Sequence, residues 1–215
     1  MRAIIFATGN ANKMVEVREI LKDLQTEIFS LKDAGITVDV EENGTTFEEN
    51  ALIKVDGIAA WCRQNGIPAM PDRDPAEFII LADDSGLEID KLNKEPGVYS
   101  ARYMGYDTSY REKNANLIAH LEGVEKAERT ARFVCAIGAA IPGQESRVVR
   151  GTIEGYIGWE ERGANGFGYD PIFYLYENDL STAEISPEEK NQISHRGKAL
   201  ELMKEILREV CSEEV

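Results

Sequence analysis

The amino-acid sequence predicts an α/β fold, in which a mixed β-sheet is flanked by helices. Short apolar runs alternate with segments whose apolar residues recur at helical spacing, and this order favours parallel strands covered by helices. Residues 131–141 and 147–159 are two long β-rich segments joined by the turn residues 142–146, which indicates an antiparallel hairpin. Parallel and antiparallel pairing together predict a mixed sheet.

The N-terminal segment predicts a strand, a polar turn and a helix. Residues 2–7 form a short apolar run, and the polar residues 8–13 follow it. Apolar residues then recur at helical spacing between positions 14 and 24. Residues 37–40 have the composition of a second strand.

A second helix is predicted to begin after Thr46. Thr46 and Glu49 match a capping box, in which each residue satisfies a backbone amide of the other. The apolar residues between positions 47 and 62 then fall on one face of a helix. The opposite, polar face carries Glu48, Asn50 and Lys54.

The remaining elements are marked by turn residues and helical periodicity. Residues 66–75 contain three prolines and predict a loop, and residues 94–97 predict a turn. Helices are expected over residues 110–121 and 199–210, and Ser186 with the following proline and glutamates has the pattern of a helix start.

The composition indicates a soluble globular protein. The chain has 215 residues, 43% of them hydrophobic and 29% charged, and 24 Lys and Arg against 39 Asp and Glu give a formal charge of −15. This charge opposes sequence-independent binding to nucleic acid, which needs many cationic side chains. We expect no membrane partner, because no signal segment is visible and the apolar run 133–141 is too short to span a bilayer.

The cysteines and histidines predict neither a disulfide framework nor a histidine metal site. Cys62 and Cys135 lie in apolar patterns and Cys211 near the C-terminus, so buried free thiols in a reducing cytoplasm are expected. The two histidines, His120 and His195, are far apart in the sequence.

The most informative segment is 78–86. Five apolar or small residues end in Asp83 and Asp84, followed by Ser85 and Gly86, which predicts a buried strand that ends at an acidic turn. Adjacent buried carboxylates require compensation, and Mg²⁺ binds to such hard oxygen ligands together with substrate phosphates. The alternative is a solvated turn in which one Asp caps a backbone amide.

Residues 8–13 lie where a strand passes into a helix. Free N–H groups at a helix N-terminus bind anions, Gly9 allows close approach of the backbone, and Lys13 adds a positive charge. The Walker A pattern is absent. The alternative is an ordinary Asn or Thr cap with an exposed lysine.

Two later segments suggest recognition of a nucleobase. Residues 163–171 are rich in glycine around Phe167 and Tyr169, either of which could stack on a planar base. His195 and Arg196 offer donors that suit a 6-oxo purine and leave adenine unpaired. The alternatives are an aromatic turn and a capped helix with solvated cations.

Taken together, these segments resemble the inosine/xanthosine triphosphate pyrophosphatase family. The resemblance runs from Ala7 to about Leu202, nearly the whole chain. It is carried by motifs in the family's order: residues 7–10 with Lys13, 46–51 with Lys54, 82–87, 96–103, 166–171 and 193–197.

The resemblance implies a fold, a reaction and an assembly. The fold is an elongated mixed β-sheet flanked by helices, with two lobes and a central cleft in a single pyrophosphatase domain over residues 1–215. The reaction is Mg²⁺-dependent hydrolysis of inosine, deoxyinosine or xanthosine triphosphate (ITP, dITP or XTP) to the monophosphate and pyrophosphate. A homodimer is also implied.

Roles for individual residues follow from their motif positions. The resemblance implies that Asp84 accepts a proton, that Glu41 and Asp84 bind the metal, and that Lys54 and Ser85 contact phosphate. The residues implied to bind the triphosphate are Thr8, Gly9, Asn10, Ala11, Asn12 and Lys13. The residues implied to surround the nucleoside are Phe167, Gly168, Tyr169, Asp170, Lys190, His195 and Arg196.

Some positions depart from the family pattern or leave the assignment open. Asn165 stands where the family often has glycine, and the loop 66–77 is longer than usual. Glu42 and Glu49 compete with Glu41 as metal ligands. Two other functions stay open: a sensor that binds a purine triphosphate without cleaving it, and a pyrophosphatase for modified pyrimidine nucleotides.

Overall fold

The fold is described from a computed structural model that defines the backbone of residues 2–212 and the side chains of residues 2–210. Six strands form one sheet in the order β2-β1-β3-β4-β5-β6. β1 pairs in parallel with β2 and β3, whereas β5 pairs antiparallel with β6, so the predicted mixed sheet is confirmed. The strands are β1 (Ala3–Phe6), β2 (Ile28–Ser30), β3 (Phe78–Ile89), β4 (Thr130–Ala140), β5 (Arg147–Ile157) and β6 (Phe173–Tyr174).

The chain divides into two compact units. Unit 1 consists of Met1–Asp84, Cys135–Gly151 and Gly197–Val215, and unit 2 consists of Ser85–Val134 and Thr152–Arg196. β3, β4 and β5 each contribute residues to both units. The peptide bond between Asp84 and Ser85 joins the units within β3.

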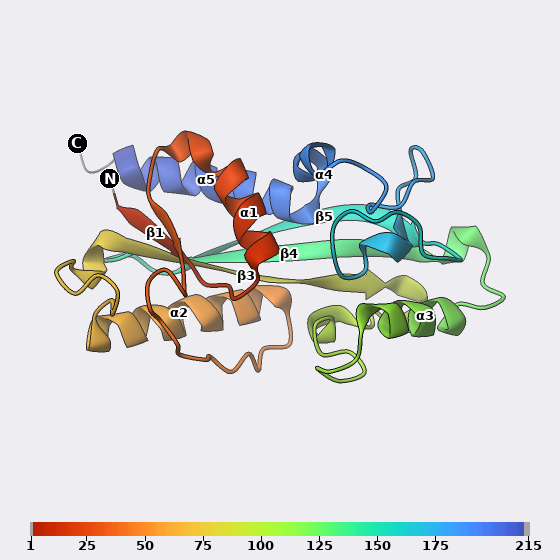
Figure 1. The fold of residues 1–215 in the computed structure, drawn as a ribbon, viewed down its shortest axis with the longest axis horizontal. Coiled ribbons are helices and arrows are strands. Elements are labelled where there is room, and N and C mark those ends of the chain that lie inside the picture. Colours follow the sequence, from red (N-terminus) through yellow and green to blue (C-terminus); the bar gives the residue numbers. More distant parts are fainter. Residues whose placement is uncertain (1, 213–215) are drawn as a thin grey trace. The chain divides into compact units, whose positions relative to one another are not determined.

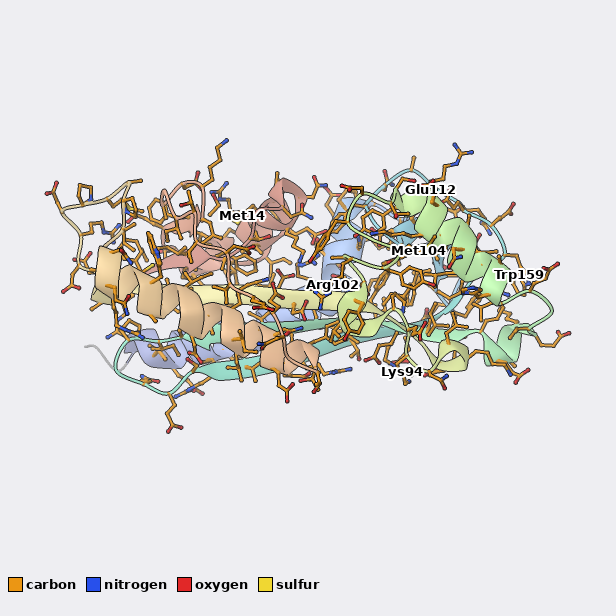
Figure 2. All side chains as sticks on the ribbon, turned by 90° about the horizontal axis from the view of Figure 1, so that it is seen from below. Met14, Lys94, Arg102, Met104, Glu112 and Trp159 are labelled. Atoms are coloured by element: carbon orange, nitrogen blue, oxygen red, sulfur yellow. The ribbon has the colours of Figure 1, made fainter. Side chains whose placement is uncertain are left out.

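In unit 1, helices pack on both faces of the strands. α1 (Ala11–Ile20) and α5 (His195–Ser212) are drawn on one side in Figure 1, and α2 (Phe47–Asn65) on the other. Successive strand residues point to opposite faces, so Ile79 and Leu81 pack in the cluster that contains Met14 of α1, labelled in Figure 2. The cluster on the α2 side is built from alternate strand positions and helix residues, including Phe78, Ile80, Ala82, Val55 and Ile58.

Unit 2 has its own apolar cluster. It includes Leu117 of α3 (Tyr110–His120), Phe133 of β4 and Phe173 of β6. Ser109 caps α3 in a full capping box with Glu112. The short helix α4 (Pro187–Ile193) begins at the N-cap Ser186, as the sequence predicts.

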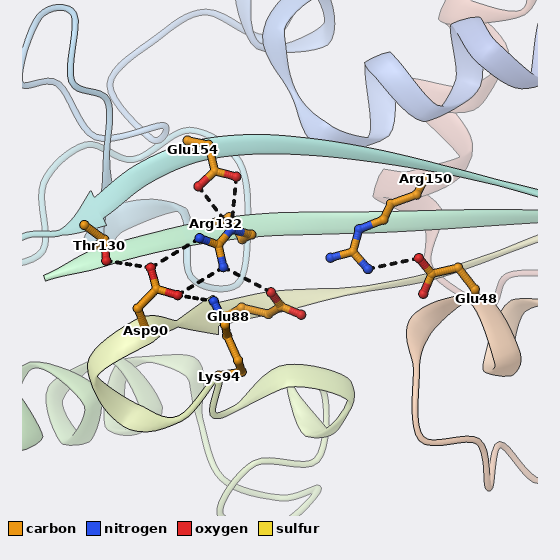
Figure 3. A network of polar contacts seen from close by, with 8 residues as sticks. All are labelled: Glu48, Glu88, Asp90, Lys94, Thr130, Arg132, Arg150 and Glu154. Atoms are coloured by element: carbon orange, nitrogen blue, oxygen red, sulfur yellow. Dashed lines mark hydrogen bonds and ion pairs between the residues drawn. The ribbon is translucent and has the colours of Figure 1, made fainter.

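Charged side chains on β3, β4 and β5 form a polar network in unit 2 (Figure 3). Arg132 of β4 donates to Glu154 of β5 at 3.0 Å and to Asp90, just after β3, at 3.1 and 3.2 Å. Thr130 and Lys94 also donate to Asp90. The network therefore joins neighbouring strands of the sheet across their charged side chains.

The structure corrects the positions of two predicted strands. Residues 37–40 are not a strand, because Val38 and Val40 pack against the α2-side cluster without pairing. Ile28–Ser30, which the sequence analysis did not predict, pairs with β1 instead. The acids Asp83 and Asp84 do not form a turn, since β3 continues through them to Ile89.

Other elements match the sequence. Both Cys62 and Cys135 are buried free thiols, as predicted, whereas the side chain of Cys211 lies outside the described residues. In the described residues, no helix has the length and apolar character needed to span a bilayer.

Candidate active site

The continuous β3 strand places its two central acids on opposite faces. Asp83 lies on the α1 side and forms an ion pair with Lys13 of α1, with Nζ to Oδ distances of 2.9 and 3.0 Å. Asp84 lies on the α2 side, where its Oδ2 accepts a hydrogen bond of 2.9 Å from Asn50 Nδ2. The two adjacent carboxylates therefore have different partners and separate environments.

The surroundings of Asp84 shift its pKa towards neutrality. Burial raises its pKa to about 6, because the charged form loses hydration. The bond from Asn50 and the charge of Lys54 lower the pKa, whereas the charges of Glu42 and Asp83 raise it further. A carboxylate poised near neutral pH in this way is a candidate general base.

Asn50 holds Asp84 in place and is a residue whose role the sequence analysis missed. We expected Asn50 on the polar face of α2, but it is only 1% exposed. Its Oδ1 accepts a bond of 2.8 Å from the Gly44 N–H, so its Nδ2 is directed to Asp84. A Cβ at Gly44 would lie 2.8 Å from Asn50 Oδ1, so glycine permits this contact. Asn50 stood in a motif of the sequence, but only the fold reveals its partner.

The turn before α1 has the predicted helix-cap geometry. Asn10 is the N-cap, and its Oδ1 accepts from the N–H groups of Asn12 and Lys13 at 2.9 and 3.4 Å. Thr8 Oγ1 accepts from the Asn10 N–H at 3.1 Å. Gly9 is exposed, and a Cβ placed there would meet no heavy atom within 4 Å. The side chains of this turn thus order the backbone, and the anion-binding role of residues 8–13 stays a prediction.

The acids upstream of α2 also differ in their contacts. Glu42 is half-buried and pairs with Lys54 Nζ at 2.6 Å, and its charge acts on Asp84. Glu41 is exposed. Glu49 accepts from the N–H and hydroxyl of Thr45 at 2.7 and 2.9 Å, while its own N–H bonds to Thr46 Oγ1. These contacts favour Glu42 as the acid that acts together with Asp84, and the metal role of Glu41 stays a prediction.

The residues around Asp84 fit a divalent cation. Within the described part of the chain, no group of three or more His, Cys, Asp or Glu side chains forms a metal-binding cluster. Mg²⁺ does not require one, since it is commonly held by one or two carboxylates and the substrate phosphates. A cation would also relieve the repulsion between Glu42 and Asp84 that raises the Asp84 pKa.

In unit 2, two of the predicted nucleoside residues, Lys190 and Arg196, lie near the Phe167 ring. The Lys190 ammonium lies 5.1 Å and the Arg196 guanidinium 5.8 Å from the centroid of the Phe167 ring. Arg196 Nη2 lies 3.5 Å from Ser85 Oγ, at the limit of a hydrogen bond. His195 is buried and stacks on Phe133 at 4.9 Å.

Five of these residues are buried, since Lys190 is 6%, His195 6% and Arg196 3% exposed, and Tyr169 and Asp170 are buried as well. Tyr169 is 4% exposed, donates its hydroxyl to the Ser100 carbonyl and contacts Tyr110 edge-on, so Phe167 is the ring with exposed surface. Asp170 is 2% exposed and pairs with Lys190 Nζ at 2.7 Å. The side chains of Tyr169 and Asp170 therefore stabilise the loop by contacts with the protein interior.

A separate cavity does not contain the predicted residues. It has a volume of about 680 Å³ in unit 1 and is lined by the middle of α2, the start of β3 and the 142–146 turn. None of the residues implied by the resemblance lines it. We therefore describe the candidate residues as two groups, one around Asp84 in unit 1 and one around Phe167 in unit 2, and give this cavity no role.

Comparison with known proteins identifies the family. The model of the Ham1 family matches residues 4–206. The chain belongs to this family. A Bacillus licheniformis protein named dITP/XTP pyrophosphatase is 45% identical over 207 residues, which cover 96% of this chain and 98% of that protein. The sequence-based resemblance to the inosine/xanthosine triphosphate pyrophosphatases is thus confirmed.

Solved structures of Ham1 proteins share the fold. A HAM1 protein from Coxiella burnetii has a TM-score of 0.82 and 38% identity, and the match covers 97% of this chain and 100% of that one. The Ham1 protein of Staphylococcus aureus has a TM-score of 0.81 and 37% identity, with coverages of 96% and 98%. The α/β fold class is therefore confirmed independently of the sequence pattern.

Proposed function

We propose that this Ham1 protein is a nucleoside triphosphate pyrophosphatase that removes ITP, dITP and XTP from the nucleotide pool by hydrolysis to the monophosphate and pyrophosphate. The observation that carries the proposal is the 45% identity, over 98% of its length, to a relative named dITP/XTP pyrophosphatase. Residues 1–215 act as one catalytic domain in this proposal.

Asp84 is the proposed catalytic residue. A water molecule attacks the α-phosphorus, a new P–O bond forms, the bond to the oxygen that bridges to the β-phosphorus breaks, and pyrophosphate leaves. Asp84 accepts the proton of the attacking water. Its pKa of about 6 supports this role, since a general base is most effective when its pKa lies near the operating pH.

Mg²⁺ is the proposed cofactor, with Asp84 and either Glu41 or Glu42 as its protein ligands. When bound, Mg²⁺ supplies neutralisation of phosphate charge. Lys54, next to Glu42, and Lys13, at the start of α1, are the proposed cationic contacts of the triphosphate. The backbone of the turn at residues 8–13 provides N–H groups at a helix N-terminus, where phosphate binding is favourable.

The unit 2 residues are proposed to recognise the purine. The partly buried ring of Phe167 is the proposed stacking surface, and the buried side chains of Lys190, His195 and Arg196 supply the proposed donors to the 6-oxo group and the sugar–phosphate. A 6-amino purine such as adenine would present a donor to these donors and leave them unpaired.

The decisive experiment measures pyrophosphate release from a panel of triphosphates with Mg²⁺ and with EDTA. We expect the highest kcat/KM for ITP, dITP and XTP, low values for ATP and for modified pyrimidine triphosphates, and no release in EDTA. Thermal stabilisation by ITP without product would instead identify a sensor. A preference for modified pyrimidines would reject the purine assignment.

The family resemblance also leads us to propose a homodimer in a reducing cytoplasm. The buried free thiols of Cys62 and Cys135 are consistent with that compartment. Light scattering after size-exclusion chromatography tests the assembly, and a monomer mass at micromolar concentration would reject it.

A further inference from the structure

The segment from Thr182 to Ile185 lies along the glycine-rich loop of residues 163–171 in unit 2. Side chains with no assigned role form hydrogen bonds between this segment and the loop. We propose that Thr182 and Asn165 are positioning residues for nucleobase discrimination: they hold the loop and Asp170 so that the Lys190 ammonium and the Phe167 ring keep a fixed relation. This inference rests on the proposed function and extends it to residues that do not touch the substrate.

The Asp170 carboxylate is fully engaged by the protein. Its Oδ2 accepts from Lys190 Nζ at 2.7 Å and from the Phe167 N–H at 2.8 Å. Its Oδ1 accepts from Thr182 Oγ1 at 2.9 Å. Asp170 and Thr182 are each 2% exposed and Lys190 is 6% exposed. A carboxylate buried in this way needs such partners, and the three donors fix its orientation.

Gly166 allows the carboxylate to approach this closely. Its backbone has a φ of +75°, and a Cβ placed there would lie 2.2 Å from Asp170 Oδ2 and 3.2 Å from Lys190 Nζ. The glycine-rich composition of the loop therefore serves the internal ion pair between Asp170 and Lys190. It also leaves the Phe167 N–H free to donate to Asp170 Oδ2.

Asn165 supplies an independent tie to the same segment. Its N–H donates to the Ala183 carbonyl at 2.9 Å, and its side-chain Nδ2 donates to the Ile185 carbonyl at 2.9 Å. A glycine at this position would retain the first bond and lose the second. The side chain of Asn165 thus adds a bond between the loop and the segment that leads into α4.

These contacts set the position of one of the donors proposed to recognise the base. Lys190 is one of the three residues proposed to donate to the 6-oxo group and the sugar–phosphate, and Asp170 fixes its ammonium 5.1 Å from the centroid of the Phe167 ring. If Thr182 no longer donates, the carboxylate loses one of its three restraints and the ammonium gains freedom. Such freedom weakens binding of a 6-oxo purine more than binding of adenine, which gains nothing from this donor.

The test compares Thr182→Val, Thr182→Ser and Asn165→Ala with a matched control. Thr130→Val is the control, because Thr130 also donates to an aspartate, Asp90 Oδ2, at 2.6 Å in the same unit but outside the loop. The measurement is the ratio of kcat/KM for ITP to that for ATP. We expect the ratio to fall about tenfold in Thr182→Val, which corresponds to ~1.4 kcal/mol, to fall less in Asn165→Ala, and to be retained in Thr182→Ser and Thr130→Val.

A second measurement does not depend on turnover. Amide hydrogen exchange at Phe167, whose N–H donates to Asp170, should become faster in Thr182→Val and stay unchanged in Thr130→Val. If Thr182→Val does not fold, the Asn165→Ala variant decides by the same two measurements, because it removes only one exposed side chain.

The outcomes separate this inference from the proposed function. Absence of pyrophosphate release by the wild-type protein overturns the proposed function, and the inference falls with it. Wild-type turnover of ITP, combined with an unchanged ITP-to-ATP ratio and unchanged exchange at Phe167 in the folded variants, overturns the positioning role alone.

Discussion

Asp84 and Asp90 are separated by six positions in the sequence, yet their surroundings have opposite effects on their charge. Burial raises the pKa of Asp84 to about 6, and no cation forms an ion pair with it among the described side chains. Burial also acts to raise the pKa of Asp90, but hydrogen bonds from Lys94, Thr130 and Arg132 outweigh it and lower the pKa below its usual range. The Asp90 region stabilises a charge, whereas the Asp84 region holds a carboxyl group ready to accept a proton.

The difference separates structural acids from functional ones. A carboxylate whose oxygens accept hydrogen bonds from cations and a hydroxyl contributes to stability and has little tendency to take up a proton. A buried carboxylate with a single amide donor is costly to maintain as an anion, and such a cost is typical of active sites. The following predictions test this division, from the largest expected effect to the smallest.

Asp84→Asn should abolish most of the activity. The amide cannot accept the proton of the attacking water, so we expect kcat for ITP to fall on the order of 10³-fold. The rate of pyrophosphate release from ITP at saturating Mg²⁺ measures kcat. Asp90→Asn serves as the control, and we expect it to keep the wild-type kcat. Retention of more than half of the wild-type rate by Asp84→Asn would remove Asp84 from the mechanism.

The same Asp84→Asn substitution should stabilise the metal-free protein at high pH. The folded pKa of about 6 lies above the ordinary Asp pKa of 3.8, so protonation of Asp84 favours folding below pH 3.8, and this contribution is lost as the pH rises through 6. At pH 8 we expect the variant to be more stable by about 2–3 kcal/mol, and near pH 3.5 by about zero. Urea unfolding in EDTA across this range measures the difference; a constant difference would contradict the raised pKa.

Arg132→Met should destabilise the protein by about 1–2 kcal/mol, because it leaves several carboxylates without their shared cation. The loss should be largest at neutral pH and decrease as the pH falls below the ordinary pKa of Asp, since the lowered Asp90 pKa contributes stability only where the carboxylate is charged. Arg150→Met is the matched control, since Arg150 donates to Glu48 at 3.0 Å on a more exposed site (Figure 3). Urea unfolding measures the free energy of unfolding of both variants. Equal decreases would show that the network around Arg132 stabilises the protein no more than the exposed pair of Arg150 and Glu48 does.

Asn50→Ala should shift the pH dependence of catalysis. The bond from Asn50 lowers the Asp84 pKa, so its removal should raise that pKa further. We expect the acid limb of the kcat/KM profile for ITP to move upward by roughly half a pH unit to one unit. An unmoved limb would mean that another group controls the profile.

The sequence predicted the elements well where local pattern determines them. The cap residues Thr46, Ser109 and Ser186 precede helices whose periodicity is visible in the chain, although the sequence analysis singled out only Thr46 and Ser186. β2 was missed because three partly buried residues have too short a pattern, and only their pairing with β1 defines them. The continuation of β3 through Asp83 and Asp84 was missed because acids are poor strand formers, and here each finds a partner on its own face.

The residues of the candidate site were also predictable only in part. Family motifs located Asp84, Lys13 and Phe167, and the structure gives Asp84 and Lys13 environments that suit the proposed roles. The residues that hold them were not predictable, since Asn50 reaches Asp84 across 34 positions and Thr182 reaches Asp170 across 12. Such long-range partners depend on the folded chain and leave no local signature.

The division of the chain into two units has a practical consequence for experiments. Five successive segments alternate between the units, so the polypeptide passes from one unit to the other four times. No single cleavage can release either unit as one continuous fragment, and neither can be expressed alone from an uninterrupted piece of the gene. Truncation would leave unpaired strand edges in both, so the two units of this protein are inherited, synthesised and lost together.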